Sequence, residues 1–109
     1  MNDTEFNIDV AAFYGVTVVA VRGAVDARTA PTLSAAFAVI ENSRHLALDL
    51  SKVEFMDSSG LNALLVKAEQ MRPQGGALVI TSASGQVHQL LAYANLNSLL
   101  EADEPFGPQ

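Results

Sequence analysis

The sequence predicts a small α/β domain with a mixed sheet, in which a parallel core carries one antiparallel strand from the N-terminal part of the chain. Three observations lead to this class. Short segments that are rich in β-branched residues, or that alternate apolar and polar residues, recur along the chain. Segments whose apolar residues follow the period of a helix separate the later ones, and a length of 109 residues suits a single hydrophobic core. The expected order is β-β-α-β-α-β-α. Strands separated by a helix pair in parallel, whereas the first two strands are close enough to form an antiparallel hairpin.

The first two strands differ in their patterns. Residues 6–10 alternate apolar and polar side chains, which is typical of a half-buried strand. A short connection ends at Gly15, and residues 16–21 form a nearly continuous β-branched run, which predicts a more central strand. Gly23 is expected to break this run.

The later elements follow from apolar periodicity and helix-end residues. Thr29 and Pro31 predict a helix start, because a hydroxyl can cap the helix and proline is tolerated in its first turn. This helix is expected to end near Asn42, and a strand follows at 46–50. A second helix is expected at 61–71, ended by Pro73 and Gly75, and a further strand at 77–81. The last helix is expected to be capped by Ser84 and ended by Asn95.

Residues 1–109 are expected to form a single domain. Its core is expected within residues 6–100, with an apolar patch at Leu96, Leu99 and Leu100. Residues 101–109 are acidic and then rich in Pro and Gly, which predicts a flexible tail.

Composition excludes several classes of function. The chain has no cysteine, so a disulfide framework, a thiol nucleophile and a thiolate metal site are excluded. Its net charge is −6 and its six Lys and Arg residues are scattered, so nucleic acid and anionic membranes are poor partners. The polar, acidic N-terminus is unlike a signal peptide, and no apolar run reaches the length of a membrane span. A cytoplasmic location is therefore expected.

One candidate site precedes the second helix. Asp57, Ser58, Ser59 and Gly60 stand where a helix exposes unpaired backbone N–H groups and a partial positive charge. A serine there can cap the helix, and a phosphate on Ser58 would meet an anion site without disturbing the fold. Plain capping is the simpler explanation of the spacing, because Ser, Asp and Gly are the commonest residues at a helix entry, but one capping side chain suffices and here three stand together.

Two further features belong to the same hypothesis. Phe55 and Met56 are expected in the loop before the helix, where they either meet a partner or cover the core. Asp26 lies between a strand and the helix that starts at Thr29, so it is either a cap or part of the same site. If the second and third strands are parallel, Asp26 and Ser58 lie on one edge of the sheet.

Enzymatic and metal sites are not expected. His45 and His88 are isolated and lack the spacing of metal ligands. There is no Gly-x-Ser-x-Gly elbow and no phosphate-binding loop that ends in Gly-Lys-Ser/Thr. A serine hydrolase remains an alternative only if a remote base meets Ser58 in space.

The residues from about 6 to 100 resemble the STAS domains, and within them the bacterial anti-sigma factor antagonists of the sporulation and general-stress systems. The most specific match is Phe-Met-Asp-Ser-Ser-Gly-Leu at residues 55–61, after the strand at 48–50. Residues 23–26 with Thr29 resemble the family's Gly-x-Leu-Asp segment and its downstream Thr. Ala24 departs from the acidic residue often found in that segment, which puts partner choice in doubt, and Asn95 stands where Gly is common.

The resemblance implies a STAS-type sheet of four to five strands packed with three to four helices. It also implies a partner switch. The unphosphorylated antagonist binds an anti-sigma factor that is also its serine kinase and thereby frees a sigma factor. Phosphorylation of Ser58 ends that binding, and a PP2C-type phosphatase restores it. The kinase supplies ATP and Mg²⁺, so no cofactor is expected in this domain. The expected partner interface comprises Asp26, Thr29, Phe55, Met56, Asp57, Ser58, Ser59 and Gly60.

Some members of the family serve elsewhere. A scaffold or regulatory subunit of a stress-sensing or lipid-transport complex, without a phosphate switch, is therefore the alternative. The complete Asp-Ser-Ser-Gly segment at residues 57–60 favours phosphoregulation over it.

Overall fold

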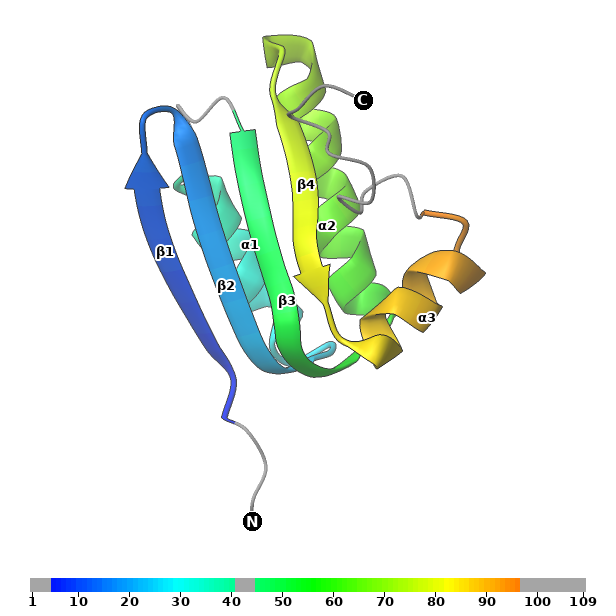
Figure 1. The fold of residues 1–109 in the computed structure, drawn as a ribbon. Coiled ribbons are helices and arrows are strands. Elements are labelled where there is room, and N and C mark those ends of the chain that lie inside the picture. The colour runs from blue at the N-terminus through cyan, green and yellow to red at the C-terminus, as the bar shows by residue number, and fades with distance from the viewer. Residues whose placement is uncertain (1–4, 41–44, 97–109) are drawn as a thin grey trace.

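The computed structural model describes residues 5–40 and 45–96, which form a four-stranded mixed sheet with three α-helices (Figure 1). The strand order is β1-β2-β3-β4, with β1 antiparallel to β2 and the other neighbours parallel. Helices α1 and α2 lie behind the sheet, and α3 lies beyond the carboxyl end of β4. The expected class and element order are confirmed.

The first two strands form a tight hairpin. Strand β1 (Asn7–Phe13) pairs with β2 (Val16–Val25) without a register shift. The two residues between them, Tyr14 and Gly15, have φ of 47° and 88°, as two-residue hairpin turns of the primed types require. The expected end of the first strand at residue 10 was wrong. The turn takes only two residues, so β1 continues to Phe13.

Strand β2 does not end at Gly23, contrary to the expectation. Gly23 has φ of 94°, and the β2–β3 register shifts between Gly23 and Ala24. An added Cβ at Gly23 would lie 2.7 Å from the Cα of Phe6. Glycine therefore absorbs an irregularity and a close backbone approach within a strand that continues to Val25.

Strand β3 (His45–Met56) is much longer than expected. It pairs with β2 as far as Met56, but with β4 (Ala77–Ala83) only as far as Leu50. Phe55 and Met56 therefore lie at the end of a strand. The expectation that they lie in a loop was wrong. Ser51, Lys52 and Glu54 are polar and only Val53 among them is apolar, which hides the continuation from a search for apolar periodicity.

The core lies between the sheet and two helices, α1 (Ala30–Ala38) and α2 (Ser58–Met71). A buried lysine side chain connects the two helices through hydrogen bonds. Lys67 of α2 is 7% exposed, and its Nζ donates to the carbonyl oxygens of Phe37 and Ile40, each at 2.8 Å. A cation at the end of α1 also complements the negative end of its dipole. The fully buried side chains include Leu33, Leu46, Leu48, Leu50, Leu64, Ile80 and Leu91.

The other helix ends agree with the expectations. Helix α2 is followed by a 3₁₀ turn, η1 (Arg72–Gln74), which contains Pro73 and ends at Gly75 with φ of 78°. Ser84 caps α3 (Gly85–Tyr93) by accepting a bond from the N–H of Val87 at 3.4 Å. Asn95 has φ of 63° just past the end of α3.

Some expectations concern parts of the chain outside the described residues. The end of the first helix near Asn42, the apolar residues Leu99 and Leu100 and the tail at 101–109 are among them. Among the helices of residues 5–40 and 45–96, none combines the length and the apolar character that crossing a lipid bilayer would need.

Candidate functional site

The carboxyl ends of β2 and β3 lie side by side and bring the two candidate segments together. Val25 pairs with Met56 in the parallel ladder, and the N–H of Asp57 donates to the carbonyl oxygen of Val25 at 3.1 Å. Asp26 follows the end of β2, and Ser58 begins the helix after β3. The expectation that Asp26 and Ser58 share one edge of the sheet is confirmed.

Asp57, not Ser58, caps helix α2. The Asp57 Oδ1 accepts bonds from the N–H groups of Ser59 at 2.8 Å and Gly60 at 3.3 Å. Ser58 is the first helical residue and is exposed. Of the three capping side chains that the sequence offered, Asp57 fills the role and Ser58 does not. A phosphate on Ser58 would also find these two helix amides already bound to a carboxylate.

The turn between β2 and α1 is held by Asp26 and Thr29. The Asp26 Oδ1 accepts bonds from the N–H groups of Arg28 at 3.0 Å and Thr29 at 3.3 Å. The Thr29 hydroxyl donates to the carbonyl oxygen of Ala24 at 2.7 Å and accepts from the N–H of Asp26 at 3.0 Å. Thr29 occupies the N-cap position as expected, but its hydroxyl does not cap α1; it ties the turn back to β2.

The charge of this edge is mainly negative. The backbone N–H of Arg28 lowers the pKa of Asp26 below its ordinary 3.8, and the N–H of Thr29 and the charge of Arg28 act in the same direction against partial desolvation. Asp26 is therefore anionic at neutral pH. The Arg28 guanidinium lies 3.6 Å from the Asp26 carboxylate and is itself 85% exposed.

The expected interface residues divide into surface and core. Phe55 is 46% exposed, whereas Met56 is 1% exposed. Gly60 is buried, and an added Cβ there would lie 2.7 Å from Val25 Cγ1 and 2.8 Å from Met56 Cγ. Met56 and Gly60 thus position the start of α2 from beneath, while Phe55 and Ser58 face outward.

Sequence reasoning missed Gln86, a residue of α3 that fixes this site. The Gln86 Oε1 accepts a bond from the N–H of Met56 at 2.8 Å, and its Nε2 donates to the carbonyl oxygen of Met56 at 3.2 Å. The β3–β4 register ends at the Leu50–Ala83 pair, so the amide side chain of Gln86 replaces a strand neighbour at Met56. A single glutamine 30 residues away gives no pattern that sequence analysis could detect.

A shallow hollow lies beside the site, between the N-terminal halves of α1 and α2. Its volume is about 330 Å³, and its lining is made mainly of small side chains. The lining includes Ala27, Ala30, Pro31, Ser59, Ala63 and Val66. The hollow is large enough for a side chain, and Ser59, the neighbour of Ser58, lines it.

Within the described residues there is no group of three His, Cys, Asp or Glu side chains that could hold a metal ion. His45 begins β3, at the opposite end of that strand from Ser58, and His88 lies exposed on α3. The geometry here suits recognition: an exposed hydroxyl, two carboxylates, one exposed guanidinium and an adjacent hollow.

Comparisons with known proteins give the family. Residues 7–107 match the model of the STAS domain. The Anti-sigma-B factor antagonist of Listeria monocytogenes is 30% identical over 83 residues, which cover 74% of this chain and 73% of that protein. The crystal structure of an anti-sigma factor antagonist from Mycobacterium paratuberculosis has a TM-score of 0.77 at 28% identity, and covers 88% of this chain and 83% of that one.

A third protein shares the fold at lower identity. The anti-sigma factor antagonist SpoIIAA in its unphosphorylated form has a TM-score of 0.77 at 16% identity, and the match covers 86% of this chain and 85% of that one. The structural matches and the match to the family model both cover most of this chain. The chain belongs to the STAS domain family.

Proposed function

We propose that this domain is an anti-sigma factor antagonist whose binding is switched off by a phosphate on Ser58. The observation that carries the proposal is the exposure of Ser58 at the first position of α2, on the edge that also presents Asp26. Membership in the STAS family and relatives that are named anti-sigma factor antagonists support the choice of partner. The partner is an anti-sigma factor that is also a serine kinase, and both act in the cytoplasm.

The physical argument for a switch is local electrostatics. A phosphate adds about −1.5 to −2 charges at pH 7. At Ser58 it stands beside the carboxylate of Asp57, whose Oδ1 already accepts two of the first amide N–H groups of α2. Inside an interface, such a charge without a partner weakens binding by about 2–5 kcal/mol, or roughly 30-fold to several thousand-fold.

The fold is expected to survive the modification. The cap of α2 is made by Asp57 and the turn before α1 by Asp26 and Thr29, so no described structural bond depends on the Ser58 hydroxyl. The phosphate therefore alters the docking surface and leaves the core in place. A PP2C-type phosphatase then restores binding, and the domain itself needs no cofactor and performs no catalysis.

A scaffold role without a switch receives less support. It explains the Asp-Ser-Ser segment as a helix cap, but Asp57 alone fills that role and leaves the Ser58 side chain exposed. An exposed hydroxyl next to a filled cap fits a kinase substrate better.

Phosphorylation with the candidate kinase and Mg-ATP, followed by mass spectrometry, tests the site. We expect one phosphate on Ser58, none on the Ser58→Ala variant, and wild-type phosphorylation of the Ser59→Ala control. Full phosphorylation of Ser58→Ala at another residue would contradict the assignment.

A binding measurement tests the switch. We expect Ser58→Glu to weaken the complex with the anti-sigma factor at least 30-fold, because the added charge stands inside the interface. The control Gln70→Glu adds the same charge to an exposed position near the far end of α2, and should leave the affinity within about twofold. Equal losses for both variants would mean that net charge, and not the Ser58 surface, controls binding.

A further inference from the structure

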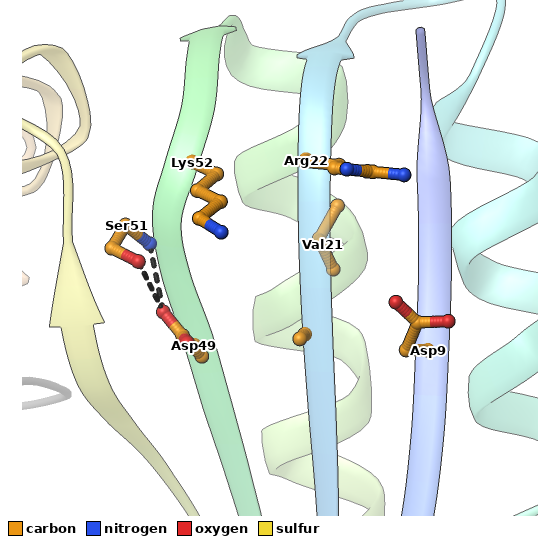
Figure 2. Close-up of a pocket in the computed structure, with 7 residues that line it drawn as sticks. Asp9, Val21, Arg22, Asp49, Ser51 and Lys52 are labelled. Carbon is orange, nitrogen blue, oxygen red and sulfur yellow. Dashed lines mark hydrogen bonds between the residues drawn. The ribbon is translucent and has the colours of Figure 1, made fainter. Parts of the chain in front are cut away.

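The face of the sheet opposite α1 and α2 carries a charged hollow that the proposed switch does not use. Its volume is about 160 Å³. Figure 2 shows it across β1, β2 and β3, with Arg22 and Lys52 toward one end and Asp9 and Asp49 toward the other. Ala20 lies between the two carboxylates, and its small side chain leaves the space open.

The sheet register arranges these charges in two rows. Arg22 pairs with Lys52, and Ala20 pairs both with Asp9 and with Asp49. The rows are two residues apart along β2, which corresponds to about 7 Å. One row is therefore cationic and the other anionic, and a small molecule can span the distance between them.

A bulge in β3 is what brings Lys52 to this face. Asp49 and Lys52 are three residues apart, so in a regular strand their side chains would point to opposite faces. The register shift between Ala20 and Arg22 inserts an extra residue in β3 and turns Lys52 to the side of Asp49. The cationic row exists because of this local irregularity.

Ser51 holds the Asp49 carboxylate in place. Its Oδ1 accepts bonds from the Ser51 N–H at 3.0 Å and from the Ser51 hydroxyl at 2.7 Å, shown as dashed lines in Figure 2. The Ser51 hydroxyl lowers the pKa of Asp49 below 3.8, and the charge of Lys52 contributes in the same direction. Asp49 is therefore ionised at neutral pH.

The opposite charges are close but not joined. Within the described residues, the ion pairs of Arg28 with Asp26 and of Arg72 with Glu69 involve neither Arg22 nor Lys52. Cations and carboxylates that remain apart leave hydrogen-bonding capacity on both sides of the hollow.

We propose that this hollow binds a compact zwitterion of the α-amino-acid class, with the ligand carboxylate on Arg22 and Lys52 and the ligand ammonium on Asp9 and Asp49. A simple anion would also meet the two carboxylates and a simple cation the two cationic groups, so a ligand with both charges matches the hollow better than either. Its volume is similar to the roughly 150 Å³ of a cavity that takes a benzene ring, so a small side chain fits and a large one does not.

An NMR titration tests the proposal, with glycine, acetate and methylammonium as probes at equal ionic strength. Glycine should cause saturable shifts of the backbone amides of residues 9, 20–22 and 49–52 at millimolar concentrations. Acetate and methylammonium should each bind at least about tenfold more weakly, because each lacks one charge-assisted contact. Equal shifts with acetate or methylammonium, no saturation up to tens of millimolar glycine, or shifts confined to other residues would overturn the proposal.

Variants separate charge from shape. Arg22→Gln and Asp49→Asn should each weaken glycine binding by about tenfold or more, since each removes one side of the charge match. Ala20→Val keeps every charge but fills the hollow, and should abolish binding. Arg72→Gln, which removes a cation on η1, is the control and should bind as the wild type does. Unchanged binding by Ala20→Val would show that the hollow is not the site, provided that its spectrum shows an intact fold.

Discussion

At the residue scale, the start of α2 gives adjacent side chains different tasks. Asp57 accepts two bonds from helix N–H groups, whereas Ser58 is exposed and makes no bond on which the helix depends within the described residues. The proposed phosphorylation of Ser58 would therefore not require the helix to open first. This separation also makes the structural role of the segment and its proposed regulatory role testable independently.

Replacement of Asp57 and of Ser58 by alanine should have unequal effects on stability. Asp57→Ala should lower the free energy of unfolding by about 1 kcal/mol, because the cap is lost. Ser58→Ala should change it by less than about 0.5 kcal/mol, as is usual for an exposed side chain. Urea denaturation followed by circular dichroism measures both. An equal loss for the two variants would show that the Ser58 hydroxyl shares in the cap.

Gly60 is required for close packing under the site. An alanine Cβ would lie 2.7 Å from Val25 Cγ1 and 3.1 Å from the Val25 carbonyl oxygen, and the backbone atom cannot easily move away. Gly60→Ala should therefore lower the free energy of unfolding by about 1–3 kcal/mol. Gly85→Ala is the matched control, because Gly85 begins α3 with open space around it, and should be neutral or stabilising by up to about 1 kcal/mol. Calorimetry that found equal effects would contradict this packing.

At the element scale, the site depends on the part of β3 that extends beyond β4. Beyond Leu50 this segment has a strand neighbour only on the β2 side. Gln86 replaces the missing neighbour at Met56 with two hydrogen bonds from its side chain. Helix α3 is thereby coupled to the residue that lies two positions before Ser58.

Removal of this amide should loosen the end of β3. Gln86→Ala deletes the acceptor for the Met56 N–H, and two lost bonds correspond to about 1–2 kcal/mol. The hydrogen exchange of the Met56 amide should therefore accelerate about 5- to 30-fold. Gln89→Ala, at an exposed position of α3, is the control and should leave that rate unchanged. Unaltered exchange at Met56 in Gln86→Ala would rule out the coupling.

The same elements show what the sequence could and could not predict. Periodicity and helix-end residues correctly predicted the strands and α-helices of the described residues, because apolar faces and residues such as Pro31 and Ser84 act locally. The ends of β2 and β3 were missed, because Gly23 and a polar stretch interrupt the apolar pattern without ending the strand. The role of Gln86 depends on a contact across 30 residues, which no local pattern records.

At the scale of the whole molecule, polar groups gather in two separate places. One is the edge where β2 and β3 end, which presents Asp26 and Ser58. The other is the open face of the sheet, where Asp49 and Lys52 line the charged hollow (Figure 2). Both lie outside the apolar core between the sheet and α1 and α2. The phosphate proposed for Ser58 and the ligand proposed for the hollow would therefore both contact the surface and leave this core in place.

Stability of the whole domain should decrease in acid through two carboxylates. In the folded protein, the Ser51 hydroxyl lowers the pKa of Asp49 and the Arg28 N–H lowers the pKa of Asp26, both from 3.8. In the unfolded chain these bonds are absent, and the pKa of each carboxyl group returns to its ordinary value. A carboxyl group whose pKa is lower in the folded protein than in the unfolded chain stabilises the fold. This stabilisation is complete when the pH is above the pKa of the unfolded chain, and it is lost as the pH falls through the pKa of the folded protein.

Urea denaturation between pH 6 and about 3 measures this loss, because stability should rise with pH through the lower part of that window. Asp49→Asn cannot titrate, and Ser51→Ala removes the hydroxyl that stabilises the carboxylate, so both should make the dependence shallower than in the wild type. Ser34→Ala removes an exposed hydroxyl on α1 and should keep the wild-type slope. A slope that Ser51→Ala leaves unchanged would mean that the Ser51–Asp49 bond makes no difference between the folded and unfolded chains, and the acid sensitivity would then have to come from other carboxylates.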